Sequence, residues 1–71
     1  MTINEYIEGR LYCAEHATTR TLAEKCFEHA YGALEFYLMV HPEDEAKYTA
    51  LWDNYGDTGW RAKFETVIAE K

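Results

Sequence analysis

The chain has 71 residues, enough for one domain spanning 1–71, and folding hides only about 60% of the unfolded surface of so short a chain. With 13 acidic against 7 basic residues, its net charge of −6 disfavours direct binding to nucleic-acid phosphates or to anionic membranes. Hydrophobic residues make up 48% of the sequence and aromatic residues 15%, so we expect some of the aromatic rings to face a partner or a ligand.

The expected compartment is the cytoplasm. The first residues contain no basic stretch followed by an apolar one, which is the arrangement of a secretory signal. The apolar run over residues 30–40 is interrupted by Glu35 and is far shorter than the roughly 20 residues of a membrane span. In a reducing compartment, Cys13 and Cys26 are expected as free thiols.

The first predicted helix covers residues 3–17. Thr2 and Glu5 have the spacing of a capping box, which marks a helix start. Gly9 lies inside this helix, and its small size is expected to let another helix approach closely. Apolar residues recur at three- and four-residue steps and predict one buried face, made of Ile3, Ile7, Leu11 and Ala14.

A turn is predicted at residues 18–21, where the sequence Thr-Thr-Arg-Thr has poor helix propensity. Thr21 and Glu24 repeat the capping-box spacing, so that a second helix over 21–40 would form an N-terminal hairpin with the first. No glycine or proline interrupts the chain here, and the apolar pattern nearly continues through the cluster. A single long helix over residues 3–40 is therefore the alternative.

The second helix should change character along its length. Glu24, Glu28 and Glu35 mark its solvent side, but Phe36 and Met39 join that side near the C-terminal end, where the helix becomes apolar nearly all round. That pattern is typical of a helix enclosed on every side. The predicted buried face comprises Leu22, Ala23, Cys26, Ala30, Ala33, Leu34, Tyr37 and Leu38.

His41-Pro42 ends the second helix, because the residue before proline is pushed away from helical torsions. Three acids, Glu43 to Glu45, then favour the start of a third helix over 43–55 through its dipole. Gly56 is expected to cap that helix, and a fourth helix covers 59–70. The expected buried residues of these last two helices are Tyr48, Leu51, Trp52, Tyr55, Trp60, Phe64, Val67 and Ile68.

Two Cys-x-x-His pairs, Cys13 with His16 and Cys26 with His29, supply the ligand types of a tetrahedral zinc site. In the hairpin the two cysteines would lie at the same level. However, His16 falls roughly 160° from the centre of the apolar stripe, and the two histidines lie about 9 Å apart along the helix axes. We therefore expect buried cysteines, surface histidines, no metal and no cofactor, with a small zinc-binding protein as an alternative.

Catalytic residues are not expected. The chain contains no serine and no phosphate-binding glycine loop. Asp57-Thr58-Gly59 matches the triplet of aspartic proteases but lies between predicted helices, where it is typical of a turn followed by a helix cap. A cysteine nucleophile needs a positioned histidine base, and an exposed His29 is poorly suited to that role. The sequence thus favours a protein that is not an enzyme.

The sequence predicts an all-α bundle of three to four helices, completed by homodimerisation. Once one face of each helix is buried, Tyr12, Phe36 and Met39 remain as a candidate interface. A non-catalytic, self-associating interaction module is the function that these features favour. The alternative is an acidic decoy that inhibits a basic nucleic-acid-binding protein, but its acids would need to gather on one face, and here they are spread over all predicted helices.

Overall fold

The computed structural model describes residues 2–53 and 59–71, and all its regular elements within these ranges are helical. This confirms the predicted all-α fold. The described elements are α1 (Ile3–Glu15), α2 (Arg20–Val40), the short 3-10 helix η1 (Pro42–Asp44), α3 (Glu45–Trp52) and α4 (Trp60–Ala69).

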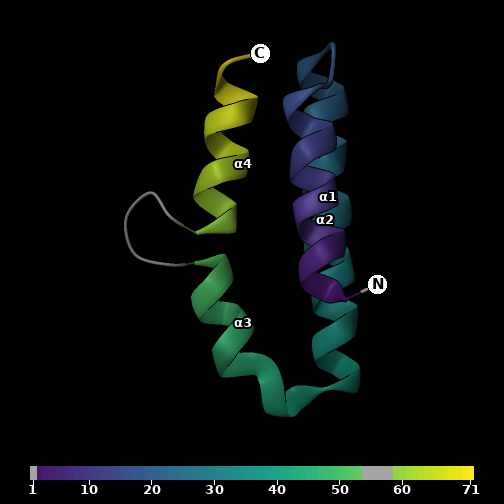
Figure 1. Ribbon diagram of the computed structural model, residues 1–71, viewed down its shortest axis with the longest axis vertical. Helices are drawn as coiled ribbons and strands as arrows, with labels where there is room; N and C mark the ends of the chain where they lie inside the picture. The colour runs from purple at the N-terminus through teal and green to yellow at the C-terminus, as the bar shows by residue number, and fades with distance from the viewer. Residues whose placement is uncertain (1, 54–58) are drawn as a thin grey trace.

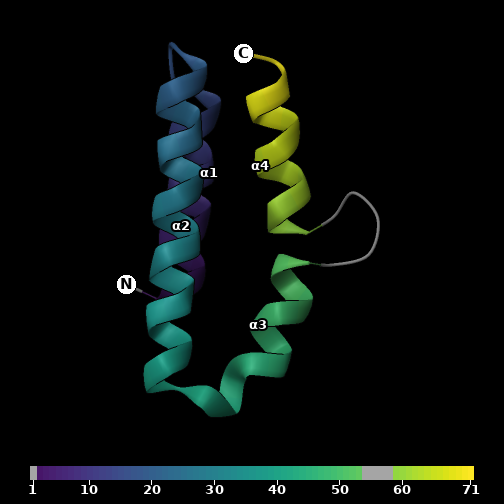
Figure 2. The same ribbon diagram turned by 180° about the vertical axis from the view of Figure 1, so that it is seen from behind.

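α1 and α2 form an antiparallel hairpin, which confirms the predicted turn and rules out one long helix (Figures 1 and 2). The predicted capping box starts α1: the Glu5 amide donates to the Thr2 hydroxyl at 3.1 Å, and the Thr2 amide donates to the Glu5 carboxylate at 3.2 Å. Both partners lie within one turn of the chain, so this signal could be read locally.

The predicted cap of α2 was wrong by two residues. Thr19, not Thr21, is the N-cap, and its hydroxyl accepts a hydrogen bond from the Leu22 amide at 3.2 Å. Arg20 is the first residue of α2 and lies four positions before Glu24. The two side chains form an ion pair at 3.1 Å. The first helix also ends earlier than predicted, at Glu15 rather than at residue 17.

The later helices are shorter than predicted. Residues 42–44 form a 3-10 turn, in which the Asp44 amide donates to the His41 carbonyl at 3.1 Å, and α3 then runs only to Trp52. α4 spans Trp60–Ala69, one residue less at each end than the predicted 59–70. The predicted helix end at Tyr55, the Gly56 cap, and Asp57 and Thr58 of the triplet lie outside the described residues.

Two short helices, α3 and α4, lie along one side of the hairpin that α1 and α2 form (Figure 1). α4 lies beside the closed end of the hairpin, and α3 lies beside the C-terminal half of α2 (Figure 1). At the closed end the Lys71 ammonium group donates to the Glu15 carbonyl at 2.9 Å and so satisfies a free carbonyl at the end of α1. The Cα atoms extend over 36 × 25 × 16 Å, so the molecule is flat.

Aromatic rings from three helices fill the centre of the bundle. Phe27 of α2 stacks on Trp52 of α3 at 5.7 Å between ring centroids and on Phe64 of α4 at 5.3 Å. Phe64 is fully buried and Trp52 is 5% exposed, as predicted. Offset contacts of this kind contribute about 0.5–1.5 kcal/mol each beyond the area that they bury. These rings therefore join α3 and α4 to the hairpin.

Two tyrosine hydroxyls hold the region around α3 in place. The Tyr48 hydroxyl donates to the side-chain oxygen of Asn4 at 2.8 Å and so links α3 to α1. The Tyr37 hydroxyl donates to the Asp44 carboxylate at 2.7 Å and links α2 to η1. Both hydrogen bonds are partly buried, and a hydrogen bond is electrostatically stronger in such surroundings than in water.

Three expectations about packing were wrong. Leu22 and Leu51, which the periodicity placed in the core, are 46% and 36% exposed. Leu22 lies in the first turn of α2, and Leu51 lies near the end of α3. Each is followed by a buried residue, Ala23 or Trp52, so the buried face of each helix lies to one side of the leucine. A Cβ atom placed on Gly9 would meet no described atom within 4 Å outside its own helix backbone, so no described helix approaches closely there.

Candidate interaction surface

The end of α2 exposes three large apolar side chains. Met39 is 79% exposed, Phe36 is 67% exposed and Val40 is 58% exposed. The cause is the unequal length of the hairpin, because α2 has 21 residues and α1 has 13, so that α2 continues past the start of α1 (Figure 1). The all-round apolar pattern predicted enclosure of this segment, but the single chain leaves it uncovered on one side.

A groove of about 580 Å³ lies beside this exposed segment, between the start of α1 and the end of α2. Among the described residues, no aspartate, glutamate, lysine or arginine lines it, although such residues make up 28% of the chain. The groove thus forms a neutral, mostly apolar surface on an acidic protein. Its lining residues are Thr2, Ile3, Tyr6, Ala33, Phe36, Tyr37, Val40, His41 and Tyr48.

Tyr37 forms part of this groove and keeps its proton over a wide pH range. Its hydrogen bond to Asp44, with a further contribution from burial, raises the pKa of the Tyr37 hydroxyl from 10.0 to about 12. Its ring also packs edge-on against Tyr48 at 5.3 Å. The uncharged Tyr37 side chain therefore links α2 to η1 and adds no charge to the groove.

The third predicted interface residue lies elsewhere. Tyr12 is 63% exposed, and its ring packs on His16 at 4.3 Å between centroids. It follows Tyr6 of the groove by six residues, which is about 120° round the axis of α1 and about 9 Å along it. The structure thus places Phe36 at the neutral groove and Tyr12 on a different side of the molecule.

The candidate zinc ligands are not gathered. Within residues 2–53 and 59–71, no three His, Cys, Asp or Glu side chains are arranged so as to hold one metal ion. Cys13 and Cys26 are free and only half-buried, while His16 and His29 are exposed. The Cys13 sulfur instead accepts a contact from the Arg10 guanidinium at 3.4 Å.

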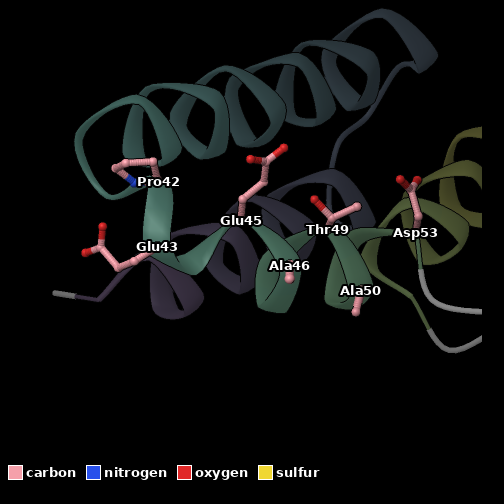
Figure 3. A pocket seen from close by; sticks show the side chains of 7 residues that line it. All are labelled: Pro42, Glu43, Glu45, Ala46, Thr49, Ala50 and Asp53. Carbon is pink, nitrogen blue, oxygen red and sulfur yellow. The ribbon is translucent and has the colours of Figure 1, made fainter.

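Another hollow, of about 720 Å³, lies along η1 and α3, and its lining does not suggest a binding site. Figure 3 shows Glu45, Thr49 and Asp53 along one side of α3 and the small side chains of Ala46 and Ala50 on another. Asp53 is already paired with Arg61 at 3.3 Å. Short, exposed side chains of this kind leave an open surface rather than an enclosed site.

A second groove, of about 500 Å³, lies between α2 and the adjoining ends of α3 and α4. Sequence reasoning missed it, because Glu28 and Glu35 were assigned only to solvent. The one local signal was their seven-residue spacing, which puts both on one face of α2 with Gly32 between them. The groove is lined by Phe27, Glu28, Tyr31, Gly32, Glu35, Trp52, Asp53 and Arg61.

Among the described helices, none combines the length and the hydropathy needed to cross a membrane. Comparisons with protein-family models, with curated proteins and with solved structures give no match for this chain. The two grooves and the exposed end of α2 are therefore the observations from which a function is inferred.

Proposed function

We propose that this chain is a non-catalytic helical interaction module that forms a homodimer through the end of α2. The observation that carries the proposal is the exposure of Phe36, Met39 and Val40 next to a groove whose described lining contains no aspartate, glutamate, lysine or arginine. Contiguous exposed apolar surface of this kind is typical of protein contacts. Phe36 and Met39 are large enough to act as anchors in such a contact.

Charge favours a second copy at this surface over any other part of the molecule. Two chains of net charge −6 repel each other, and a contact that buried carboxylates would also cost their desolvation. The neutral groove avoids the desolvation cost and brings no carboxylates into direct contact. It also lies beside the protruding Phe36, so a two-fold axis could seat each Phe36 in the partner's groove, as a self-complementary interface requires.

The expected dimer is weak. Burying two large apolar side chains from each copy contributes about 6–12 kcal/mol in total. Association costs about 4–15 kcal/mol in lost freedom. A gain near the top of the first range and a cost near the bottom of the second leave about 5.5–7 kcal/mol. This difference corresponds to a dissociation constant of about 10–100 µM.

The interior gives no support for catalysis. Within the described ranges no polar or charged side chain is buried, and no buried side-chain nitrogen or oxygen lacks a partner. Tyr37 does line a groove with a raised pKa, but its hydroxyl is already bonded to the Asp44 carboxylate. The buried residues of the described part of the chain are apolar and aromatic. A cytoplasmic setting belongs to the same proposal and fits the two free thiols, Cys13 and Cys26.

Light scattering after size-exclusion chromatography tests the homodimer. At loading concentrations from about 10 to 500 µM, we expect the mass to rise from that of one chain, 8.3 kDa, towards twice that value. Phe36→Glu and Met39→Glu should each hold the protein at the monomer mass, because each places a charge in an apolar contact.

Tyr12→Glu is the matched control. Tyr12 is as exposed as Phe36, at 63% against 67%, and the substitution adds the same charge. It should leave the association unchanged. A monomeric mass for the unaltered chain throughout this range, or equal loss of association in the Tyr12 and Phe36 variants, would contradict a dimer at the end of α2.

A further inference from the structure

The second groove combines aromatic rings with carboxylates that have no cationic partner in the described part of the chain, and this is the chemistry that recognises a guanidinium group. We propose that this groove binds an arginine side chain presented by a partner protein. The site lies between α2 and the adjoining ends of α3 and α4, whereas the proposed dimer contact uses the groove between α1 and α2. Arginine binding therefore does not depend on the proposed homodimer.

The floor of the groove is aromatic. Tyr31 is 47% exposed, and its ring lies 5.6 Å from that of Trp52 at an angle of 54°. Trp52 in turn stacks on Phe27, so the exposed ring rests on a packed support. A planar guanidinium stacks well on such a ring, and arginine is the side chain that uses this contact most often.

Two carboxylates border this floor. Glu28 and Glu35 stand about 10.5 Å apart along the axis of α2, on either side of Gly32. Within the described residues neither has a cationic partner, whereas Glu24 and Glu65 are both paired with arginine. A guanidinium placed over Gly32 would lie within reach of both free carboxylates, and charge-assisted hydrogen bonds of this type are the strong ones.

Gly32 leaves the space that such a side chain needs. A Cβ atom placed on this residue would meet no described atom within 4 Å outside its own helix backbone. Packing among the described residues therefore gives no reason for glycine in the interior of α2, where it is among the least favourable residues. Close approach of an external group is a use of glycine that explains this choice.

The groove already holds one guanidinium at its edge. Arg61, which lines the groove, pairs with Asp53 at 3.3 Å and with Glu65 at 3.0 Å. Its charge is offset by these two carboxylates, so Glu28 and Glu35 leave the groove negative. The net charge of the chain, −6, adds a general attraction for a basic partner.

A nitrogen-15 chemical-shift titration of the whole chain tests the proposal. The probe is Nα-acetyl-arginine N-methylamide, and its neutral counterpart with citrulline has nearly the same shape. We expect saturable shifts at the amides of residues 28–35 and at the Trp52 indole for the arginine probe, and none for citrulline. Equal shifts with citrulline, or with the corresponding lysine compound, would overturn the assignment to guanidinium.

Variants locate the site. The double variant Glu28→Gln with Glu35→Gln should weaken binding at least about fivefold, since both charge-assisted contacts are lost. Glu24→Gln, on the same helix but outside the groove, should change it less than about twofold. Gly32→Leu should abolish the shifts by filling the groove, with the helical circular-dichroism signal retained. Unchanged affinity in the double variant, or shifts spread over all acidic surfaces, would refute an arginine site here.

Discussion

Replacing Gly9 and Gly32 by alanine should stabilise the protein. Both residues lie in helix interiors, and at neither does an added Cβ atom meet a described atom within 4 Å outside its own helix backbone. Alanine is preferred over glycine in a helix by about 0.8–1.0 kcal/mol, partly because glycine has more freedom to lose on folding. Each substitution should therefore raise the free energy of unfolding by nearly 1 kcal/mol.

The combined effect should be large for so small a chain. The two positions lie on different helices and share no partner, so their contributions should add to about 1.6–2.0 kcal/mol. A chain of this length is expected to have a total stability of about 4–10 kcal/mol. At about 4–8 °C for each kcal/mol, the double variant should melt roughly 6–16 °C higher than the unaltered protein.

Urea and thermal unfolding, followed by circular dichroism at 222 nm, measure this gain. The measurements are best made in a Phe36→Glu background at low protein concentration, so that self-association does not enter the free energy. Lys25→Gly, at an exposed position inside α2, is the reciprocal control and should lower stability by a somewhat smaller amount. A loss of stability in either alanine variant would show that an atom occupies the space beside that glycine.

Three further predictions concern the core and the tyrosine contacts. Phe64→Ala removes a fully buried ring that packs on Phe27 and Trp52, so the free energy of unfolding in urea should fall by about 3–5 kcal/mol, and a loss below about 1 kcal/mol would refute this packing. Tyr48→Phe should cost about 1 kcal/mol in urea unfolding, and a double-mutant cycle with Asn4→Ala should give a coupling above about 0.5 kcal/mol; additive losses would refute the hydrogen bond between them. The pKa of Tyr37 is about 12 in the folded chain and 10.0 ordinarily, so its stabilising effect is present below pH 10 and is lost as the pH rises through 12. Between about pH 9 and 12, the free energy of unfolding should therefore fall more steeply with pH in the unaltered chain than in Tyr37→Phe. Parallel curves for the two proteins would refute this effect.

Local signals in the sequence determined where the helices lie. The capping box of Thr2 and Glu5 and the break at His41-Pro42 each act within one turn of the chain, and the structure has both. The spacing of Trp60, Phe64 and Ile68 likewise marked the buried face of α4 correctly, because helix periodicity depends on the chain alone. The choice between hairpin and long helix also followed a local feature, the poor helix propensity around Thr19.

Only the tertiary structure decided which apolar residues are covered. Leu22 and Leu51 fit the apolar stripes of their helices but lie where no neighbouring helix covers them, since burial requires a second element over the same face. For the same reason, the sequence could not show that the end of α2 extends beyond the start of α1 and leaves Phe36 beside a neutral groove. The groove at Glu28 and Glu35 arises from three helices that meet in space, and periodicity along α2 alone assigned these two carboxylates only to solvent.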